Sequence, residues 1–589
     1  MVKLAQKETS FLKILLIIIL GLFIYSNCLD GKFIWDDYGL IKENQYLKDW
    51  KSLPKIITGD FGVGSGVKSS FYRPLPMVIH MIEYSLWGLN VKGYHLTNVL
   101  LHIFTAITVF LFINLILYDK GISFLTSLLF LVHPINTQAV CCMSGINITA
   151  SLLFILLCLV FYIKSLSSNN IALYCMALLS FSMGLLSKES VIVAPALILL
   201  YHYTFRKSIE IKKIVPLFII LICYLLIRLV VLNSFVGVSV SPYVLLQRIP
   251  GFFVAITEYL RLLLFPFDLR IAYGDKIFSI NEPRVIAGVS VTFLLIVLAF
   301  VRKKKDPLTF FSIAWFFVTL IPVSNIYPIN SSFMMEHWLY VPCVGFFLIL
   351  SRMLRRHLNN KRAMFSLNVF AIILLAFYSY LTIRQNEYWK EPIAFYKRTI
   401  KYAPDGWIFY NELGNEYAGI MEYELAEDAY SKALGINPDA IGVYYNLAGL
   451  YQKTGRDKEA MQMFNKARAI NYRIFNSCYE SGNKNLSSGR YRESIIFYKK
   501  ALGLSPDNLA LYCDLAKSNI MIGNYSEAIR LLKNALVLNP DYPTAYNNLA
   551  VAYYYKKDYE LAVTYCDKAI ELGYKVSPKF LQLLKPYRK

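Results

Sequence analysis

Charged residues are scarce in this chain of 589 residues. They make up 17% of it, whereas 56% of the residues are hydrophobic and 15% are aromatic. With a mean hydropathy of +0.44, this composition excludes an ordinary soluble protein, and the length excludes a single domain. The sequence therefore predicts an integral membrane protein with more than one domain.

Acidic residues are scarcer than basic ones, at 39 against 61, which leaves a net charge of +22. Residues 1–384 hold 17 of these positive charges and the rest of the chain only 5, which argues against a nucleic-acid surface there. Cys-x-x-Cys spacing is missing among the ten cysteines. The cysteines therefore indicate neither a disulfide framework nor a metal site.

Eleven apolar runs are expected to cross the membrane, and the basic loops between them set their orientation. They are residues 11–29, 95–118, 121–133, 139–163, 171–187, 189–205, 214–235, 284–301, 308–323, 337–351 and 363–383. No small-residue cleavage site follows the first run, so we expect an uncleaved span with a cytoplasmic N-terminus. Gly251–Phe267 contains Glu258 and Arg261, and is expected to be a re-entrant or interfacial helix.

Three regions follow from this topology. Residues 1–384 form the membrane domain, with an acidic first extracytoplasmic loop at 30–94, and residues 385–406 form a junction. From 407 to 589 the pattern changes to amphipathic helices of about a dozen residues, expected on the same outer side. The organism is open, since both a bacterial inner membrane and an endoplasmic reticulum fit this topology.

Prolines on a 34-residue grid mark the C-terminal part. Pro404, Pro438, Pro506 and Pro540 occupy the grid, and Tyr472 stands at the one position without proline. A period of 34 is the signature of tetratricopeptide repeats, an α-solenoid of paired helices. We predict about five repeats and a closing helix near Lys579–Leu584.

Two adjacent carboxylates, Asp36 and Asp37, lie in the first loop beside Trp35. Two acids this close disfavour joint ionisation, so one can hold a raised pKa suited to proton transfer. The alternatives for such a pair are a solvated turn or a helix N-cap.

A series of short motifs follows one after another along the membrane half of the chain. They are Trp35-Asp36-Asp37, Tyr72-Arg73-Pro74-Leu75, Gly93-Tyr94-His95 with His102, His133-Pro134, Ser187-Lys188-Glu189, Tyr259-Leu260-Arg261, Pro322-Val323-Ser324-Asn325 and Glu336-His337-Trp338-Leu339-Tyr340-Val341-Pro342. Together with the repeats, this order resembles the glycosyltransferase C superfamily. Within it, the chain is similar to the transmembrane and tetratricopeptide-repeat proteins related to protein O-mannosyltransferases. Gln138 departs from the pattern, since relatives carry a glutamate there.

The resemblance implies transfer of a sugar, mannose first, from a polyprenyl phosphate to a protein Ser/Thr or a glycan hydroxyl. Such a reaction needs a base for the acceptor proton and positive charge on the leaving phosphate. Asp36 is the expected base with Asp37 as its partner, and Arg73, Lys188 and Arg261 are the expected phosphate ligands. Further substrate-site candidates are Trp35, His95, His102, His133, Glu189, Glu336 and His337. With no Asp-x-Asp motif beside Asp36, we expect no metal and no cofactor.

Bland roles compete for several of these residues. Lys188 and Glu189 could neutralise each other in a tight turn. His95 and His102, seven residues apart on one helix face, could hydrogen-bond within the bundle instead of binding metal. Glu336-His337 could cap the next helix.

Two other functions compete with glycosyl transfer. One is a non-catalytic membrane scaffold whose repeats assemble envelope or secretory proteins, and Gln138 is the residue that favours it. A transporter is disfavoured, because the spans show no paired broken halves. The expected partners are thus a lipid-linked donor and a protein in the repeat groove, with no nucleic acid.

Overall fold

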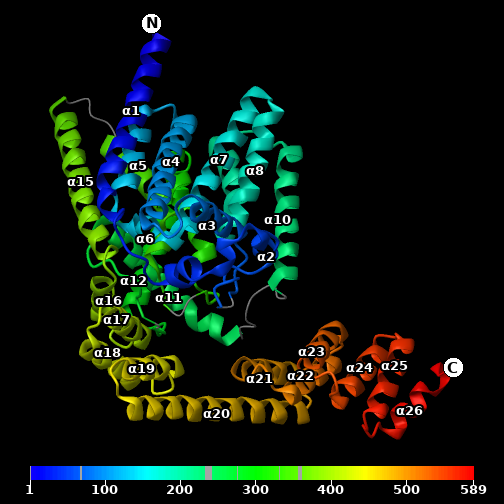
Figure 1. Ribbon diagram of the computed structural model, residues 1–589. Coiled ribbons are helices and arrows are strands. Elements are labelled where there is room, and N and C mark those ends of the chain that lie inside the picture. The colour runs from blue at the N-terminus through cyan, green and yellow to red at the C-terminus, as the bar shows by residue number, and fades with distance from the viewer. Residues whose placement is uncertain are drawn as a thin grey trace. The chain divides into compact units, whose positions relative to one another are not determined.

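The regular elements of the computed structural model are helices, and the structure describes residues 2–66, 69–232, 242–274, 276–329, 332–355 and 361–588 (Figure 1). No strand occurs among these residues. The chain divides into two units, Met1–Glu416 and Tyr417–Lys589. The boundary falls inside the first predicted repeat. Apolar helices followed by a helical solenoid confirm the predicted fold class.

Every one of the eleven apolar runs contains a helix. The apolar helices are α1 (Val2–Ile24), α4 (Val91–Leu117), α5 (Lys120–Val132), α7 (Ile146–Ser168), α8 (Ile171–Ser187), α9 (Ala194–Phe205), α10 (Ile211–Leu232), α11 (Pro242–Leu264), α12 (Pro283–Arg302), α13 (Pro307–Leu320), α14 (Cys343–Arg355) and α15 (Lys361–Tyr388).

Six helices among the described residues are long and apolar enough to cross a membrane, with a seventh if the bent pair at 120–141 is one span. The apolar helices at 171–187, 189–205 and 307–323 are shorter. Eleven crossings therefore stay a prediction. Gly251–Phe267 is helical as far as Leu264 in α11, and its expected re-entrant placement also stays a prediction.

The first loop folds into a small compact layer rather than an open turn. It contains α2 (Leu53–Thr58) and α3 (Pro74–Trp87), each opened by a proline at its first turn, where a missing N–H costs nothing. Apolar side chains from both sides of the loop form its own core. They include Phe33, Ile41, Phe61, Met77, Met81 and Tyr94. This core fixes the loop that carries Asp36 and Asp37.

The chain leaves α15 at the end of the bundle where this loop lies (Figure 1). The backbone N–H of Lys32 donates to the carbonyl of Lys390 at 3.1 Å, just before α16 (Pro392–Tyr402). The hydroxyl of Tyr38 donates to Glu416 on α17 (Trp407–Gly419) at 3.0 Å. The first loop and the entry to the repeats are therefore held together.

Paired helices fill the second unit. After α18 (Tyr423–Ile436) and α19 (Ile441–Lys453) come α20 (Asp457–Ser487), α21 (Tyr491–Leu504), α22 (Leu509–Met521), α23 (Tyr525–Leu538), α24 (Pro543–Tyr555), α25 (Tyr559–Glu571) and α26 (Pro578–Leu584). Small side chains at one position of each repeat are fully or almost fully buried, as close packing of two helices requires. They are Ala426, Ala460, Ser494, Ala528 and Ala562. The predicted closing helix is confirmed as α26.

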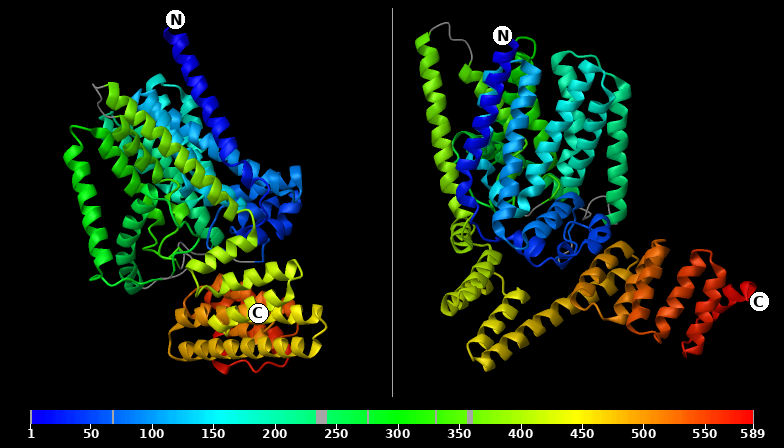
Figure 2. Two further views of the ribbon diagram at one scale, coloured as in Figure 1. Left: turned by 90° about the vertical axis from the view of Figure 1, so that its left-hand side faces the viewer. Right: turned by 45° about the horizontal axis from the view of Figure 1, so that its top comes forward.

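One helix departs from the expected length of a dozen residues. α20 runs without a break for 31 residues and joins the second repeat to the third (Figures 1 and 2). Tyr472 lies in its middle, on the grid position where the other repeats carry the proline that interrupts the helix. With an N–H to donate and no ring clash, tyrosine lets the helix continue.

Replacing Tyr472 with proline is therefore expected to break α20. Proline removes one backbone hydrogen bond and clashes with the preceding turn, at a cost of about 3 kcal/mol. We expect a lower unfolding midpoint and a new protease cut near Arg473 in the full-length chain. Tyr472→Ala is the matched control, because the side chain is exposed and alanine is a better helix former. An unchanged digestion pattern in the proline variant would contradict this role of Tyr472.

Candidate functional site

Asp37 is a buried carboxylate that the backbone holds in place. Its Oδ1 accepts from the N–H of Ser144 at 2.8 Å and its Oδ2 from the N–H of Ile34 at 3.2 Å. The thiol of Cys142 also reaches Oδ1, at 3.5 Å. These bonds tie the first loop to the segment before α7. Asp37 caps no helix N–H group, so the N-cap alternative is wrong for it.

Asp36 differs from Asp37 in being exposed to solvent. Protein atoms nevertheless crowd around its carboxyl group and exclude part of the surrounding water. Desolvation by this surrounding protein raises the pKa of Asp36 to about 6, the charge of Asp37 adds to the rise, and Arg73 opposes it. Asp36 is therefore reachable from outside and exchanges a proton near neutral pH. Both properties suit a general base.

Arg73 directly precedes α3 and faces the turn between α8 and α9. Its Nε and one Nη contact the same Oε2 of Glu189, at 2.9 and 2.8 Å. The guanidinium also lies over the ring of Phe71, at 4.1 Å from the centroid. Glu189 thus pairs with Arg73 and not with Lys188, so the predicted alternative of a Lys188–Glu189 ion pair is wrong.

Lys188 is left as a buried cation beside Arg73. Its side chain is buried, and it makes no hydrogen bond or ion pair within the part of the chain that the structure describes. Burial and, to a smaller extent, the charge of Arg73 lower the pKa of Lys188 to about 7, against the opposing effect of Glu189. A buried ammonium without a bonded acid is costly, so this position favours an anionic ligand.

His337 lies within electrostatic range of both Lys188 and Arg73. Its backbone N–H donates to Oε1 of Gln138 at 3.3 Å, and its Nδ1 is buried with no hydrogen-bond partner among the described residues. Gln138, the residue that departs from the expected motif, is therefore part of the same polar group. It brings no negative charge to the two cations.

Glu336 forms a second polar group next to this one. Its Oε1 accepts from the hydroxyl of Tyr273 at 2.6 Å and from the backbone N–H of Arg270. Burial raises the pKa of Glu336 to about 7, against the opposing effects of these donors and of Arg398. It bonds to the loop at 265–274 and caps no helix among the described residues, so the capping alternative is wrong. Arg270 and Tyr273 were not predicted, because no motif marks them in the sequence.

Trp35 connects the site to the junction. Its backbone has φ of 55°, a strained conformation for a bulky side chain that costs about 1–3 kcal/mol. The turn places the ring centroid of Trp35 5.1 Å from that of Phe409. The backbone N–H of Trp35 donates to the hydroxyl of Tyr396 at 3.3 Å. The strained residue therefore directly precedes Asp36 in the first loop.

The histidines divide between the site and the bundle interior. His95 contacts the carbonyl of Gly31 at 3.2 Å and lies within electrostatic range of Asp37. His102 bonds to Tyr340 and to the carbonyl of Leu131, so both ring nitrogens are satisfied within the bundle. His133 is likewise satisfied, by the carbonyl of Leu263 and the N–H of Ile135.

Arg261 is the predicted phosphate ligand that the structure does not bring to the others. It forms an ion pair with Glu258 at 2.8 Å, one turn earlier on α11. Of the predicted residues, the structure gathers Asp36, Asp37, Arg73, Lys188, Glu189, His95 and His337. No group of three or more metal-ligating side chains occurs within the described ranges.

Comparisons with known proteins find similarity to repeat families in the C-terminal part of the chain and to whole proteins over most of its length. The tetratricopeptide repeat pattern matches residues 422–473, 475–508 and 543–572, and a TPR repeat pattern matches 520–557. A protein O-mannosyl-transferase of Caenorhabditis elegans is 24% identical over 72% of this chain and 63% of its own length. Protein O-mannosyl-transferase TMTC3 of Homo sapiens is 24% identical over 74% of this chain and 52% of its own length.

Among solved structures, the TPR protein YrrB is 24% identical over 30% of this chain and 92% of its own length, with a TM-score of 0.17. The chain is an all-helical membrane protein with tetratricopeptide repeats. Its sequence is similar to those of protein O-mannosyl-transferases, among them TMTC3 of Mus musculus and of Homo sapiens. It spans about half to two thirds of the length of the two curated relatives from Caenorhabditis elegans and Homo sapiens.

Proposed function

We propose that this chain is a membrane mannosyltransferase that takes its sugar from a polyprenyl-phosphate donor. The acceptor is a protein Ser/Thr or a glycan hydroxyl on the extracytoplasmic side. One observation carries the proposal: a reachable carboxylate of raised pKa, Asp36, lies in electrostatic range of Arg73, which in turn adjoins the buried cation Lys188. The names of the relatives support mannose as the sugar.

In the proposed reaction, Asp36 accepts the proton of the acceptor hydroxyl as its oxygen attacks C1 of the sugar. The bond from C1 to the phosphate oxygen breaks on the opposite face, with inversion. The lipid phosphate leaves with the bonding electron pair, and Arg73 and Lys188 stabilise its charge. Asp37 holds the loop and keeps the pKa of Asp36 high through its own charge.

The repeats would bring the protein acceptor, since repeats of this kind bind other proteins. A cavity of about 240 Å³ in the second unit is lined by Asn483, Leu486, Ser487, Tyr491, Lys517 and Met521. Its mixture of amide, hydroxyl and apolar groups suits a peptide. The outer location is supported by the basic loops, which the positive-inside rule places in the cytoplasm.

The experiment is transfer from a panel of polyprenyl-phosphate sugars to membrane and secreted proteins by the purified full-length chain. Transfer of mannose supports the proposal, and transfer of another sugar corrects the donor alone. No transfer with any donor would favour the scaffold, provided that the same preparation still binds protein partners.

From the pKa values of Asp36 and Lys188 we predict a bell-shaped pH profile for kcat/KM. Asp36 must be ionised to act as base, so activity rises as pH increases through about 6. Lys188 must be charged to hold phosphate, so activity falls as pH increases beyond about 7. Lys188→Arg is the control, because arginine stays charged and should remove only the alkaline decline. A profile that is flat over this range would contradict both roles.

A further inference from the structure

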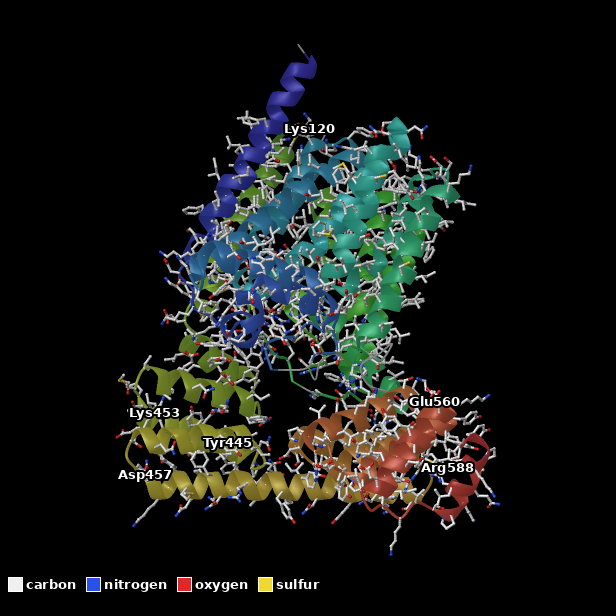
Figure 3. The ribbon with its side chains drawn as sticks, turned by 45° about the vertical axis from the view of Figure 1, so that its right-hand side comes forward. Lys120, Tyr445, Lys453, Asp457, Glu560 and Arg588 are labelled. Atoms are coloured by element: carbon white, nitrogen blue, oxygen red, sulfur yellow. The ribbon has the colours of Figure 1, made fainter. Side chains whose placement is uncertain are left out.

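The junction helix α16 contacts two segments of the first unit that are far apart in the sequence. It lies at the end of the bundle opposite Lys120, together with the first loop (Figures 1 and 3). The first contact is that of Tyr396, whose hydroxyl accepts the backbone N–H of Trp35 at 3.3 Å. Tyr396 is fully buried, and its ring centroid lies 6.5 Å from that of Trp35. This contact ties α16 to the residue that precedes Asp36.

The second segment is the loop at 265–274, which two other side chains of α16 hold. Nη2 of Arg398 donates to the carbonyl of Leu269 at 2.9 Å, and the hydroxyl of Tyr402 donates to Oδ1 of Asp268 at 2.7 Å. Asp268 has φ of 57°, a left-handed conformation that depends on support from its surroundings. The backbone conformation of this loop is therefore fixed in part by α16.

The same loop bonds to Glu336. The hydroxyl of Tyr273 and the backbone N–H of Arg270 both donate to Oε1 of Glu336. The guanidinium of Arg270 lies over the rings of Tyr273 and Tyr402, at 4.4 and 5.2 Å from their centroids. Glu336 is also within electrostatic range of Arg398. Helix α16, the loop and Glu336 thus form one packed group.

This group continues to the cations of the candidate site. His337 follows Glu336 directly in the chain and lies within electrostatic range of Lys188 and Arg73. A shift of the loop would move Glu336 and, with it, the backbone of His337. Arg398 therefore reaches the cations through the loop, although it lies on the junction helix.

We propose that α16 keeps the base and the phosphate-binding cations of the candidate site at a fixed separation, with Arg398 as a positioning residue. Arg398 acts on the cations through the loop at 265–274, and Tyr396 acts on Asp36 through Trp35. Neither side chain touches the reacting atoms. The effect on transfer rests on the proposed function, whereas the coupling of these segments to α16 does not.

Hydrogen–deuterium exchange in the full-length chain tests this coupling without any sugar transfer. Arg398→Gln removes the donor to Leu269, so amides at 268–274 and 335–338 should exchange about fivefold faster, the effect of one lost hydrogen bond. Amides of α5 near Lys120, at the opposite end of the bundle, should exchange as in the wild type. Unchanged exchange at 268–274 overturns the role of Arg398. Faster exchange that includes α5 indicates a general loss of stability and also overturns it.

A second variant separates the two contacts of α16. Tyr396→Phe removes the acceptor of the Trp35 N–H, so amides at 33–38 should exchange faster while those at 268–274 stay protected. Arg398→Gln should give the reverse pattern. If both variants loosen both segments equally, α16 detaches as a whole and Arg398 has no positioning role of its own.

Steady-state kinetics with a polyprenyl-phosphate mannose donor test the effect on the site. Arg398→Gln should raise the KM for the donor about fivefold and change kcat by less than about twofold, because displaced cations bind the donor phosphate less well. Arg398→Lys should recover most of this loss, since lysine can still donate to Leu269. A wild-type KM in Arg398→Gln overturns the positioning role. If the wild type transfers no sugar, the proposed function fails, and the exchange patterns alone decide the coupling.

A matched control removes the same charge from the same helix. Lys401 is exposed on α16, so Lys401→Gln should match the wild type in exchange and in KM. An equal change in this control would show a general effect of charge on α16 and would overturn the assignment to Arg398.

Discussion

Replacing Asp36 with asparagine is expected to lower the rate of sugar transfer by about 10²–10⁴-fold, the usual contribution of a general base. Asparagine has the same shape but cannot take the acceptor proton. The fold should be unaffected, because removing the charge also removes repulsion from Asp37. The measurement is initial transfer rate, compared at equal amounts of folded protein.

Two other carboxylates in the same loop make this test specific. Asp30→Asn should keep wild-type transfer, since Asp30 is exposed and its ion pair with Lys92 lies at the surface. Asp37→Asn should lower the unfolding midpoint, because an amide cannot accept at both positions where Asp37 accepts N–H groups. Full activity in Asp36→Asn would remove this residue from the chemistry.

The second large effect is expected from Arg73→Gln. Loss of a cation that stabilises the leaving phosphate should lower transfer by about 10²–10³-fold. The same change leaves Glu189 without its ion pair, at a cost of up to about 3 kcal/mol for a partly buried carboxylate. Transfer and thermal unfolding should therefore both be measured.

A double variant separates these two consequences. Arg73→Gln with Glu189→Gln removes the unpaired acid, so stability should return towards the wild type while transfer stays low. Arg73→Lys should keep part of the activity, since lysine has the charge but not the planar fork. If the double variant recovers transfer together with stability, Arg73 serves the fold alone.

The fold follows from the sequence to a large extent because its signals are local. Apolar runs and a 34-residue period depend on neighbouring residues, so the helices and the closing α26 were predictable. The sequence shows Tyr472 in place of proline, which explains why α20 continues, but the continuous helix was not predicted. The number of crossings is harder, since short apolar helices such as α8 and α9 fit either a span or a buried element.

The site was predictable only in part, since its partners come from distant segments. The order of motifs indicated Asp36, Arg73 and Lys188, yet nothing local shows that Glu189 chooses Arg73 over its own neighbour. Arg261 matched a motif and is instead paired with Glu258. Tyr273 and Arg270 bond to Glu336 from a loop more than sixty residues earlier, and no pattern marks them.

α20 also has a mechanical consequence. At a rise of 1.5 Å per residue, a helix of 31 residues is a strut of roughly 46 Å. Where a turn separates two repeats, one repeat can unfold or tilt without unwinding the helix of the next. Here the second and third repeats share the continuous helix α20, so unwinding of its middle would affect both. A force applied to the third repeat is therefore transmitted along α20 to the second repeat without an intervening turn.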